Sequence, residues 1–304
     1  MAEPAGSASV PTGPGRPAAG PRAGGTGTAG RGRPRRALPL RAELRRQLRR
    51  RRTKGVGWVV LLLPLLLVGA FALGQDDSGS GQRGFVDLAQ ESGANLTVFT
   101  LFASTGFLLI VVVALFAGDA VPAEASWSSL RYLLAAPVPR GRLLQQKLVV
   151  AALSSLTALV LLPAWTLLVG GVAYGWGPYV GPTGDQIGWP DFALRLLVIV
   201  AFLAVELTVV GALAFAIGVF TDAPLAAVGG AVLAMILFAI LDTISALGDL
   251  REGLPGHYAF AWADALSPTI DWSDMATGVL WSLGYAILAL WLAVWHFLRK
   301  DITS

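Results

Sequence analysis

The chain contains no cysteine among its 304 residues and only two histidines, His257 and His296. The lack of cysteine excludes disulfide bonds, thiolate metal sites and a cysteine nucleophile. A zinc site needs three or four clustered ligands, and the two histidines stand far apart in the chain without an acidic motif beside either one. We therefore interpret both histidines as ordinary structural residues and expect no metal site.

Charge is also scarce, because only 14% of the residues are charged whereas 55% are hydrophobic. Soluble domains carry about 25% charged residues. The shortfall is concentrated in long stretches that hold no charge at all, which indicates a polytopic membrane protein.

A membrane-spanning helix needs about 20 mostly apolar residues, and the sequence offers six such stretches. The fold class that they predict is an all-α polytopic membrane protein with six transmembrane helices. Pro64 falls inside the first stretch, where a membrane helix tolerates it. The six predicted spans cover approximately residues 55–75, 92–118, 148–171, 192–220, 224–241 and 275–298.

The part of the chain before the first span divides into two segments. Residues 1–38 are rich in Gly, Pro, Ala and Arg and hold hardly any aliphatic side chain, so we predict a disordered cytoplasmic tail. Residues 39–54 are rich in arginine but carry leucine at every fourth position. This spacing predicts a basic amphipathic helix that precedes the six-span transmembrane domain, residues 55–302.

The basic helix is expected to lie in the membrane interface, with its leucines in the acyl boundary and its arginines at anionic headgroups. A nucleic-acid-binding arm is the alternative. The first span begins within a few residues, which favours the lipid bilayer as partner, and we expect no nucleic-acid partner. The residues that define the interfacial helix are Leu40, Leu44, Arg45, Leu48 and Arg49.

The distribution of charge predicts the orientation of the chain. With six spans both termini lie on one side, and 20 of the 23 Lys and Arg residues fall on that side. The opposite loops hold eleven acidic residues. Because cytoplasmic loops carry an excess of Lys and Arg, we place both termini in the cytoplasm, and we expect a multi-pass protein of a bacterial cell membrane.

The cytoplasmic segment between spans two and three has a pattern of its own. Trp127, Leu130, Leu133 and Leu134 follow helical spacing and form one apolar face, which Pro137 ends. The spans cannot cover a face held away from them. The pattern therefore suggests docking into a groove of a partner protein, and a second interfacial helix on lipid is the alternative.

This segment consists of an acid, small residues, a leucine-rich turn with Arg and then P-x-x-R, and it resembles the permease subunits of type-2 ATP-binding-cassette (ABC) transporters. The basic helix at 39–54 is similar to the elbow helix of that family, and FLRKDI at 297–302 is similar to its cytoplasmic end. The resemblance covers about residues 39–302. Residues 125–129 depart from it, since the family often has Gly-Thr after the acid.

The resemblance implies that the segment is a coupling helix that docks on a separate ABC ATPase subunit. It implies a permease subunit of an exporter that acts as a dimer with itself or with a similar permease and moves a hydrophobic or amphipathic substrate. ATP and Mg²⁺ would bind to the partner, and no cofactor to this chain. The residues expected to dock are Glu124, Trp127, Leu130, Arg131, Leu133, Leu134, Pro137 and Arg140.

Two further observations bear on the function. None of the three lysines stands in a phosphate-binding GxxxxGK[ST] loop, so we do not expect the chain to be an ATPase. Glu206 lies deep in the fourth span, about 16 Å along the helix from Arg195, too far for an ion pair. Glu206 is thus either part of a translocation path or a structural hydrogen-bonding group.

Two other classes of function remain as alternatives. One is an ion-coupled carrier that works alone, with Glu206 and Asp242 as its proton sites. The other is a membrane scaffold without a transport path, whose basic N-terminus recruits an anionic partner.

Overall fold

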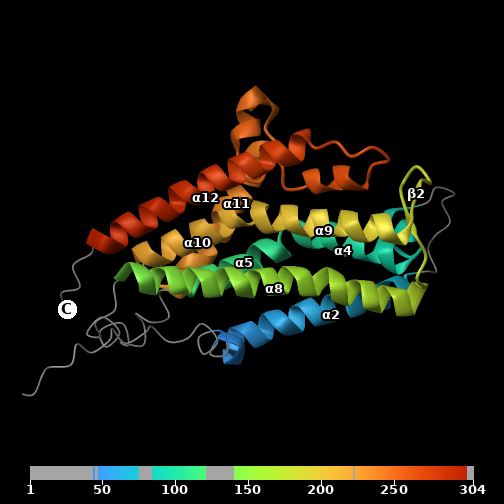
Figure 1. Cartoon of the computed structure of the whole chain (residues 1–304), viewed down its shortest axis with the longest axis horizontal. Coiled ribbons are helices and arrows are strands. Elements are labelled where there is room, and N and C mark those ends of the chain that lie inside the picture. Colours follow the sequence, from blue (N-terminus) through green and yellow to red (C-terminus); the bar gives the residue numbers. More distant parts are fainter. Residues whose placement is uncertain (1–43, 45–46, 75–83, 121–139, 222, 300–304) are drawn as a thin grey trace, which may run out of the picture. The chain divides into compact units, whose positions relative to one another are not determined.

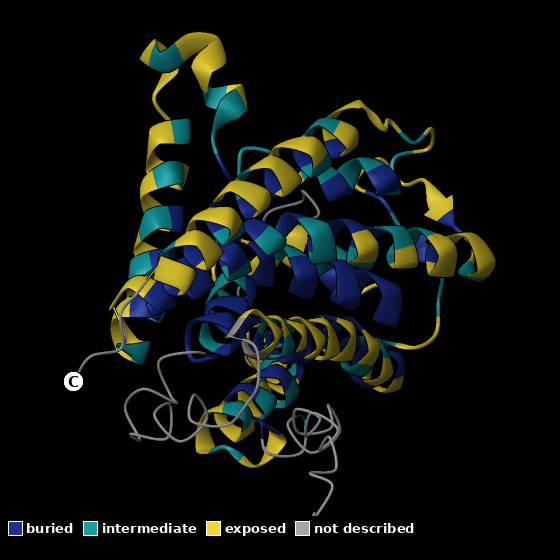
Figure 2. Ribbon diagram, turned by 60° about the vertical axis from the view of Figure 1, so that its left-hand side comes forward, coloured by how far each residue is buried: buried dark blue, intermediate teal, exposed yellow. Residues whose placement is uncertain are grey.

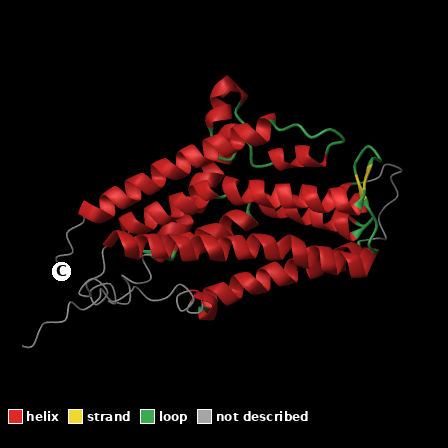
Figure 3. Ribbon diagram, in the orientation of Figure 1, coloured by secondary structure: helices red, strands yellow, loops and turns green. Residues whose placement is uncertain are grey.

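The structure is a computed structural model that describes residues 44, 47–74, 84–120, 140–221 and 223–299, without the side chains of Arg140 and Leu143. Helices make up most of these residues (Figures 1 and 3). The elements in chain order are α2 (Arg51–Leu73), α3 (Phe85–Ala89), α4 (Gly93–Thr105), α5 (Leu108–Gly118), α8 (Arg140–Tyr174), β1 (Tyr179–Val180), β2 (Gln186–Ile187), α9 (Trp189–Glu206), α10 (Thr208–Thr221), α11 (Pro224–Asp242), η2 (Ser245–Gly253), η3 (Ala261–Leu266) and α12 (Ser273–Arg299).

The helix lengths confirm the all-α polytopic membrane fold. Among the described residues, five helical segments are long and apolar enough to cross a membrane. The number rises to six if α4 and α5, which meet at an angle of 59°, form one bent span. The six spans predicted from the sequence therefore depend on this bent pair. The predicted start of the first span also shifts, because α2 already begins at Arg51 and includes residues 51–54.

Two helix breaks coincide with hydroxyl groups that compete for backbone carbonyls. The α4–α5 break follows Thr105, whose Oγ1 donates to the carbonyl oxygen of Leu101, and it falls at Gly106. The α9–α10 break falls at Leu207, beside Thr208, whose Oγ1 donates to the carbonyl oxygen of Val205 at 2.6 Å. A threonine hydroxyl that binds a preceding carbonyl slightly weakens the helical hydrogen bonds and often bends the helix.

Helix α10 lies at the centre, in contact with α5, α11 and α12. Figure 2 shows buried residues concentrated in the middle of the bundle, and large apolar side chains point outward from α2, α8, α11 and α12. Examples are Leu66 on α2 and Leu280 on α12, which are 66% and 72% exposed. Such a surface suits a protein whose outer faces contact lipid tails, which are as apolar as leucine.

Helices α4 and α8 approach each other through glycines. A Cβ atom added to Gly93 would lie 2.5 Å from the backbone nitrogen of Gly171, and one added to Gly170 would lie 2.8 Å from the Cα of Gly93. Small residues allow two membrane helices to pack backbone against backbone. This contact fixes the far end of α8 to the start of α4.

Short irregular elements close the same end of the bundle. The β1–β2 hairpin is tied to α4 because Asn95 Nδ2 donates to the carbonyl oxygen of Val180 at 2.8 Å and Asn95 Oδ1 accepts from its N–H at 3.0 Å. In the long segment between α11 and α12, Trp262 of η3 is fully buried and its ring lies 4.4 Å from that of Phe102. This segment therefore packs on the bundle instead of hanging free.

The glycine contact gives a testable prediction. We expect Gly93→Ala to lower the apparent melting temperature of the detergent-purified chain, because its Cβ would force the α4 and α8 backbones apart at a cost of about 1–3 kcal/mol. Gly69→Ala in α2 is the matched control, since a Cβ there meets nothing within 4 Å. An equal effect of both substitutions on thermal unfolding would contradict the close packing.

Candidate functional site

The directions of the helices separate the charges into two ends of the bundle (Figure 1). The starts of α2 and α8 and the end of α12 bring Arg51, Arg142 and Arg299 to one end, which we call the basic end. The starts of α9 and α12 bring Asp191 and Asp274 to the opposite, acidic end. That the basic end faces the cytoplasm stays a prediction.

Asp119 connects two helices at the basic end. Its Oδ2 accepts from Arg50 Nη1 at 2.8 Å and its Oδ1 accepts from Arg52 Nη1 at 2.9 Å, which makes two ion pairs. Asp119 is 7% exposed and follows the last residue of α5, whereas the arginines flank the start of α2. We call these three residues the Asp119 cluster. Charge-assisted hydrogen bonds to one carboxylate are about twice as strong as neutral ones.

The predicted docking segment is attached directly to this cluster. Residues 121–139 lie outside the described part of the chain, and with them lie seven of the eight predicted docking residues: Glu124, Trp127, Leu130, Arg131, Leu133, Leu134 and Pro137. The eighth, Arg140, begins α8, although its side chain is not described. The segment thus leaves one side of the basic end at Ala120 and returns at Arg140. The docking role stays a prediction.

The interfacial helix is described only near its end. Residues 47–49 are helical and lead through Arg50 into α2, while Leu40 and Arg45 lie outside the described residues. Leu44 is half-buried, and Leu48 and Arg49 are exposed. Its placement in the membrane interface stays a prediction.

Glu206 is buried in the middle of the bundle. It is 4% exposed at the end of α9, and its Oε2 accepts a hydrogen bond from Ser282 Oγ of α12, which is also 4% exposed. An ionisable side chain at the centre of a membrane helix costs about 3 kcal/mol when it lacks such a partner. This contact joins α9 to α12 beside the break at Leu207. The expectation that Arg195 is too distant to pair with Glu206 agrees with the structure.

Other polar side chains hold the segment between α11 and α12. Arg195 Nη1 donates to the carbonyl oxygens of Ala265 at 2.9 Å and Ser267 at 2.5 Å, so it ties α9 to η3. His257 Nδ1 lies 2.5 Å from Asp242 Oδ1 at the end of α11. The acid beside His257 comes from 15 residues away in the chain, which is why no motif revealed it.

The described residues contain no group of three or more His, Asp or Glu side chains that could hold a metal ion. The polar contacts at the basic end and at Glu206 join helices to one another. The arrangement therefore offers points where motion of one helix can act on another.

The comparison with known proteins decides the family. A family model described as "ABC-2 family transporter protein" matches residues 40–302, almost the whole chain. The chain belongs to the ABC-2 family of transporter proteins. It is a membrane permease of the ABC transporter class, as the resemblance implied. A search of curated proteins found no match.

Asp119 and Ser282 are the residues that sequence reasoning missed in this ABC-2 permease. The partners of Asp119 lie 67 and 69 residues away, and Ser282 lies 76 residues from Glu206. A signal for Asp119 did exist, because it is an acid in the part of the sequence predicted to lie on the same side of the membrane as nearly all the cations. A serine in an apolar span carries no such signal.

Proposed function

We propose that the chain is the membrane-spanning subunit of an ABC exporter and that a separate ATPase drives it through residues 121–139. The observation that carries this proposal is the family match over residues 40–302. The position of the segment supports it, since it is inserted at the basic end between α5 and α8. The chain would work as a dimer, with itself or with a similar permease.

The Asp119 cluster supports a mechanical role for the basic end. Helix α5 ends at a carboxylate that two arginines from the α2 side hold, so a displacement of the docking segment acts on α5 and α2 together. Helix α8 packs against α2, α4 and α5. Helices α2, α5 and α8 would therefore move together when the docking segment is displaced.

Helix α8 is suited to carry the displacement across the bundle. Its 35 residues form one helix despite Pro163, and at 1.5 Å per residue it extends about 52 Å. The hydrocarbon core is about 30 Å thick, so α8 reaches from the basic end through the membrane. In the proposal, ATP binding closes the ATPase pair, and the docked segment transmits the closure because its contacts differ between the two states.

The docking segment yields the first test of this function. We expect Leu130→Asp combined with Leu134→Asp to abolish pull-down of the partner ABC ATPase. Two charges on the apolar face would make its burial in a groove unfavourable. Membrane insertion should persist, because both residues lie between spans.

Leu250→Asp is the matched control, since Leu250 is 76% exposed in η2, far along the chain from the docking segment. It introduces one carboxylate at an exposed leucine, one of the two that the double variant introduces, and should leave ATPase binding unchanged. Normal ATPase binding by the double variant would show that the docking assignment is wrong.

A second candidate function follows from the burial of Glu206: an ion-coupled carrier that needs no ATPase. Glu206→Gln separates the two functions, because a glutamine oxygen can still accept from Ser282 but cannot titrate. The permease hypothesis predicts that ATP-driven transport in vesicles survives this substitution, whereas Glu206→Ala weakens folding. A carrier would move substrate with a pH gradient and without the ATPase, and it would lose this activity in Glu206→Gln.

A further inference from the structure

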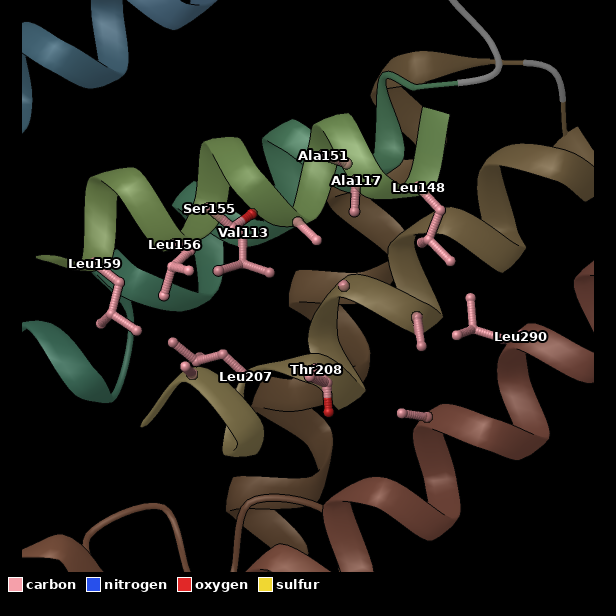
Figure 4. A pocket seen from close by; sticks show the side chains of 15 residues that line it. Val113, Ala117, Leu148, Ala151, Ser155, Leu156, Leu159, Leu207, Thr208 and Leu290 are labelled. Carbon is pink, nitrogen blue, oxygen red and sulfur yellow. The ribbon is translucent and has the colours of Figure 1, made fainter. Parts of the chain in front are cut away.

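A cavity of about 240 Å³ lies between α5, α8, α9, α10 and α12. Figure 4 shows the side chains that line it, with α8 on one side and α12 on the other. Ala117, Leu159 and Ala212 form buried parts of the wall. The lining consists of aliphatic side chains and one glycine, except for two hydroxyl groups.

The cavity opens toward the exposed surface of α8. Ala152 and Leu156, both in its lining, are exposed. They belong to the span Leu144–Tyr174, so the opening would face hydrocarbon chains and not water. An apolar cavity of about 150 Å³ stays dry and takes up benzene, so this larger one can hold a substantial apolar group.

The shape of the lining fits an elongated ligand. Along α8 it extends from Leu148 to Leu159, about 16 Å at 1.5 Å per residue. This is about half of the hydrocarbon core, which is the depth that a single alkyl chain occupies in one leaflet.

Ser155 distinguishes the cavity from an ordinary gap in packing. The neighbouring hydroxyls of α8 donate to the carbonyl four residues earlier, as Ser154 does to Val150 and Thr157 does to Leu153. Ser155 lines the cavity, and its Oγ is buried but has no hydrogen-bond partner in the described structure (Figure 4). The other hydroxyl of the lining, that of Thr208, already donates to Val205.

An unpaired hydroxyl in an apolar wall costs free energy that a ligand can recover. A buried polar group without a partner destabilises the fold, because it has lost its hydrogen bonds to water. Ser155 lies near the middle of its span, where the charged headgroup of a phospholipid would be costly. A neutral hydroxyl or carbonyl group can reach this position and can pair with Oγ, which both donates and accepts.

We infer that this cavity binds an elongated neutral amphiphile from the lipid phase, with an alkyl body along α8 and one hydroxyl or carbonyl group on Ser155. Only the role of this molecule as the transported substrate rests on the proposed function. Binding itself needs no ATPase, so loss of ATPase docking and loss of this site are separate experimental results.

The test uses the full chain in lipid nanodiscs without an ATPase, with hexadecanol that carries a mid-chain diazirine as the probe. After illumination, mass spectrometry should find adducts concentrated at 148–159, 204–212 and 286–290. A phosphatidylcholine with the same diazirine in one acyl chain should not label these positions. Equal labelling of the exposed leucines of α2, such as Leu65 and Leu66, would contradict a specific site.

Ser155→Ala tests the hydroxyl. This substitution removes a group without a partner and therefore should not destabilise the fold. We expect it to reduce labelling by the hexadecanol probe about fivefold, which corresponds to one hydrogen bond, and to leave labelling by a hexadecane diazirine unchanged. Ser154→Ala is the matched control, because that hydroxyl is paired within α8 and lies outside the lining. Equal labelling of the unsubstituted chain, Ser155→Ala and Ser154→Ala by the hexadecanol probe would show that Ser155 does not bind the ligand.

Ala152→Phe tests the cavity as a whole by filling it from its exposed side. It should abolish labelling of the cavity, whereas Ala164→Phe, the same substitution at an exposed position of α8 outside the lining, should have no effect. Unchanged labelling in Ala152→Phe would overturn the proposal. A dimer that dissociates only in Ala152→Phe would also overturn it, since a second copy would then cover this face.

Discussion

The attachment of Asp119 to Arg50 and Arg52 is the constraint on which the rest of the account depends. A carboxylate that is 7% exposed at the end of a membrane helix requires compensating charge, and two arginines from the α2 side provide it. The contact fixes the start of the first span to the end of α5. The segment that connects α5 to α8, residues 121–139, therefore begins beside a residue that cannot move independently of α2.

Helix α8 extends this constraint to the acidic end of the bundle. It meets α4 there through glycines whose backbones touch, so a shift along α8 cannot be absorbed by flexible side chains. Between its two ends the helix forms one wall of the apolar cavity. In the proposed function, the helix that follows the predicted docking segment also lines the cavity proposed for the substrate, so a single helix would connect the ATPase to the substrate.

The long uncharged apolar stretches predicted the fold class, and the resemblance of the basic helix, the cytoplasmic segment and residues 297–302 to type-2 ABC permeases predicted the family. These are local properties, because a membrane-spanning helix must satisfy its backbone hydrogen bonds within about 20 residues. The contacts of the candidate site were harder to predict from the sequence. Partners such as Asp119 with Arg52 and Glu206 with Ser282 meet across more than 60 residues of chain, and only packing brings them together. The cavity and the free hydroxyl of Ser155 likewise depend on how helices leave space between them.

The most direct measurement of the coupling uses the absence of cysteine in the natural chain. Spin labels on Gly141→Cys at the start of α8 and Val294→Cys on α12 report the distance between these helices by pulsed electron paramagnetic resonance. With the partner ATPase bound, the account predicts that ATP changes this distance and that Asp119→Asn reduces the change, while labels at Gly141→Cys and Ala164→Cys within α8 keep their separation. A distance between α8 and α12 that is the same with and without ATP would contradict the account.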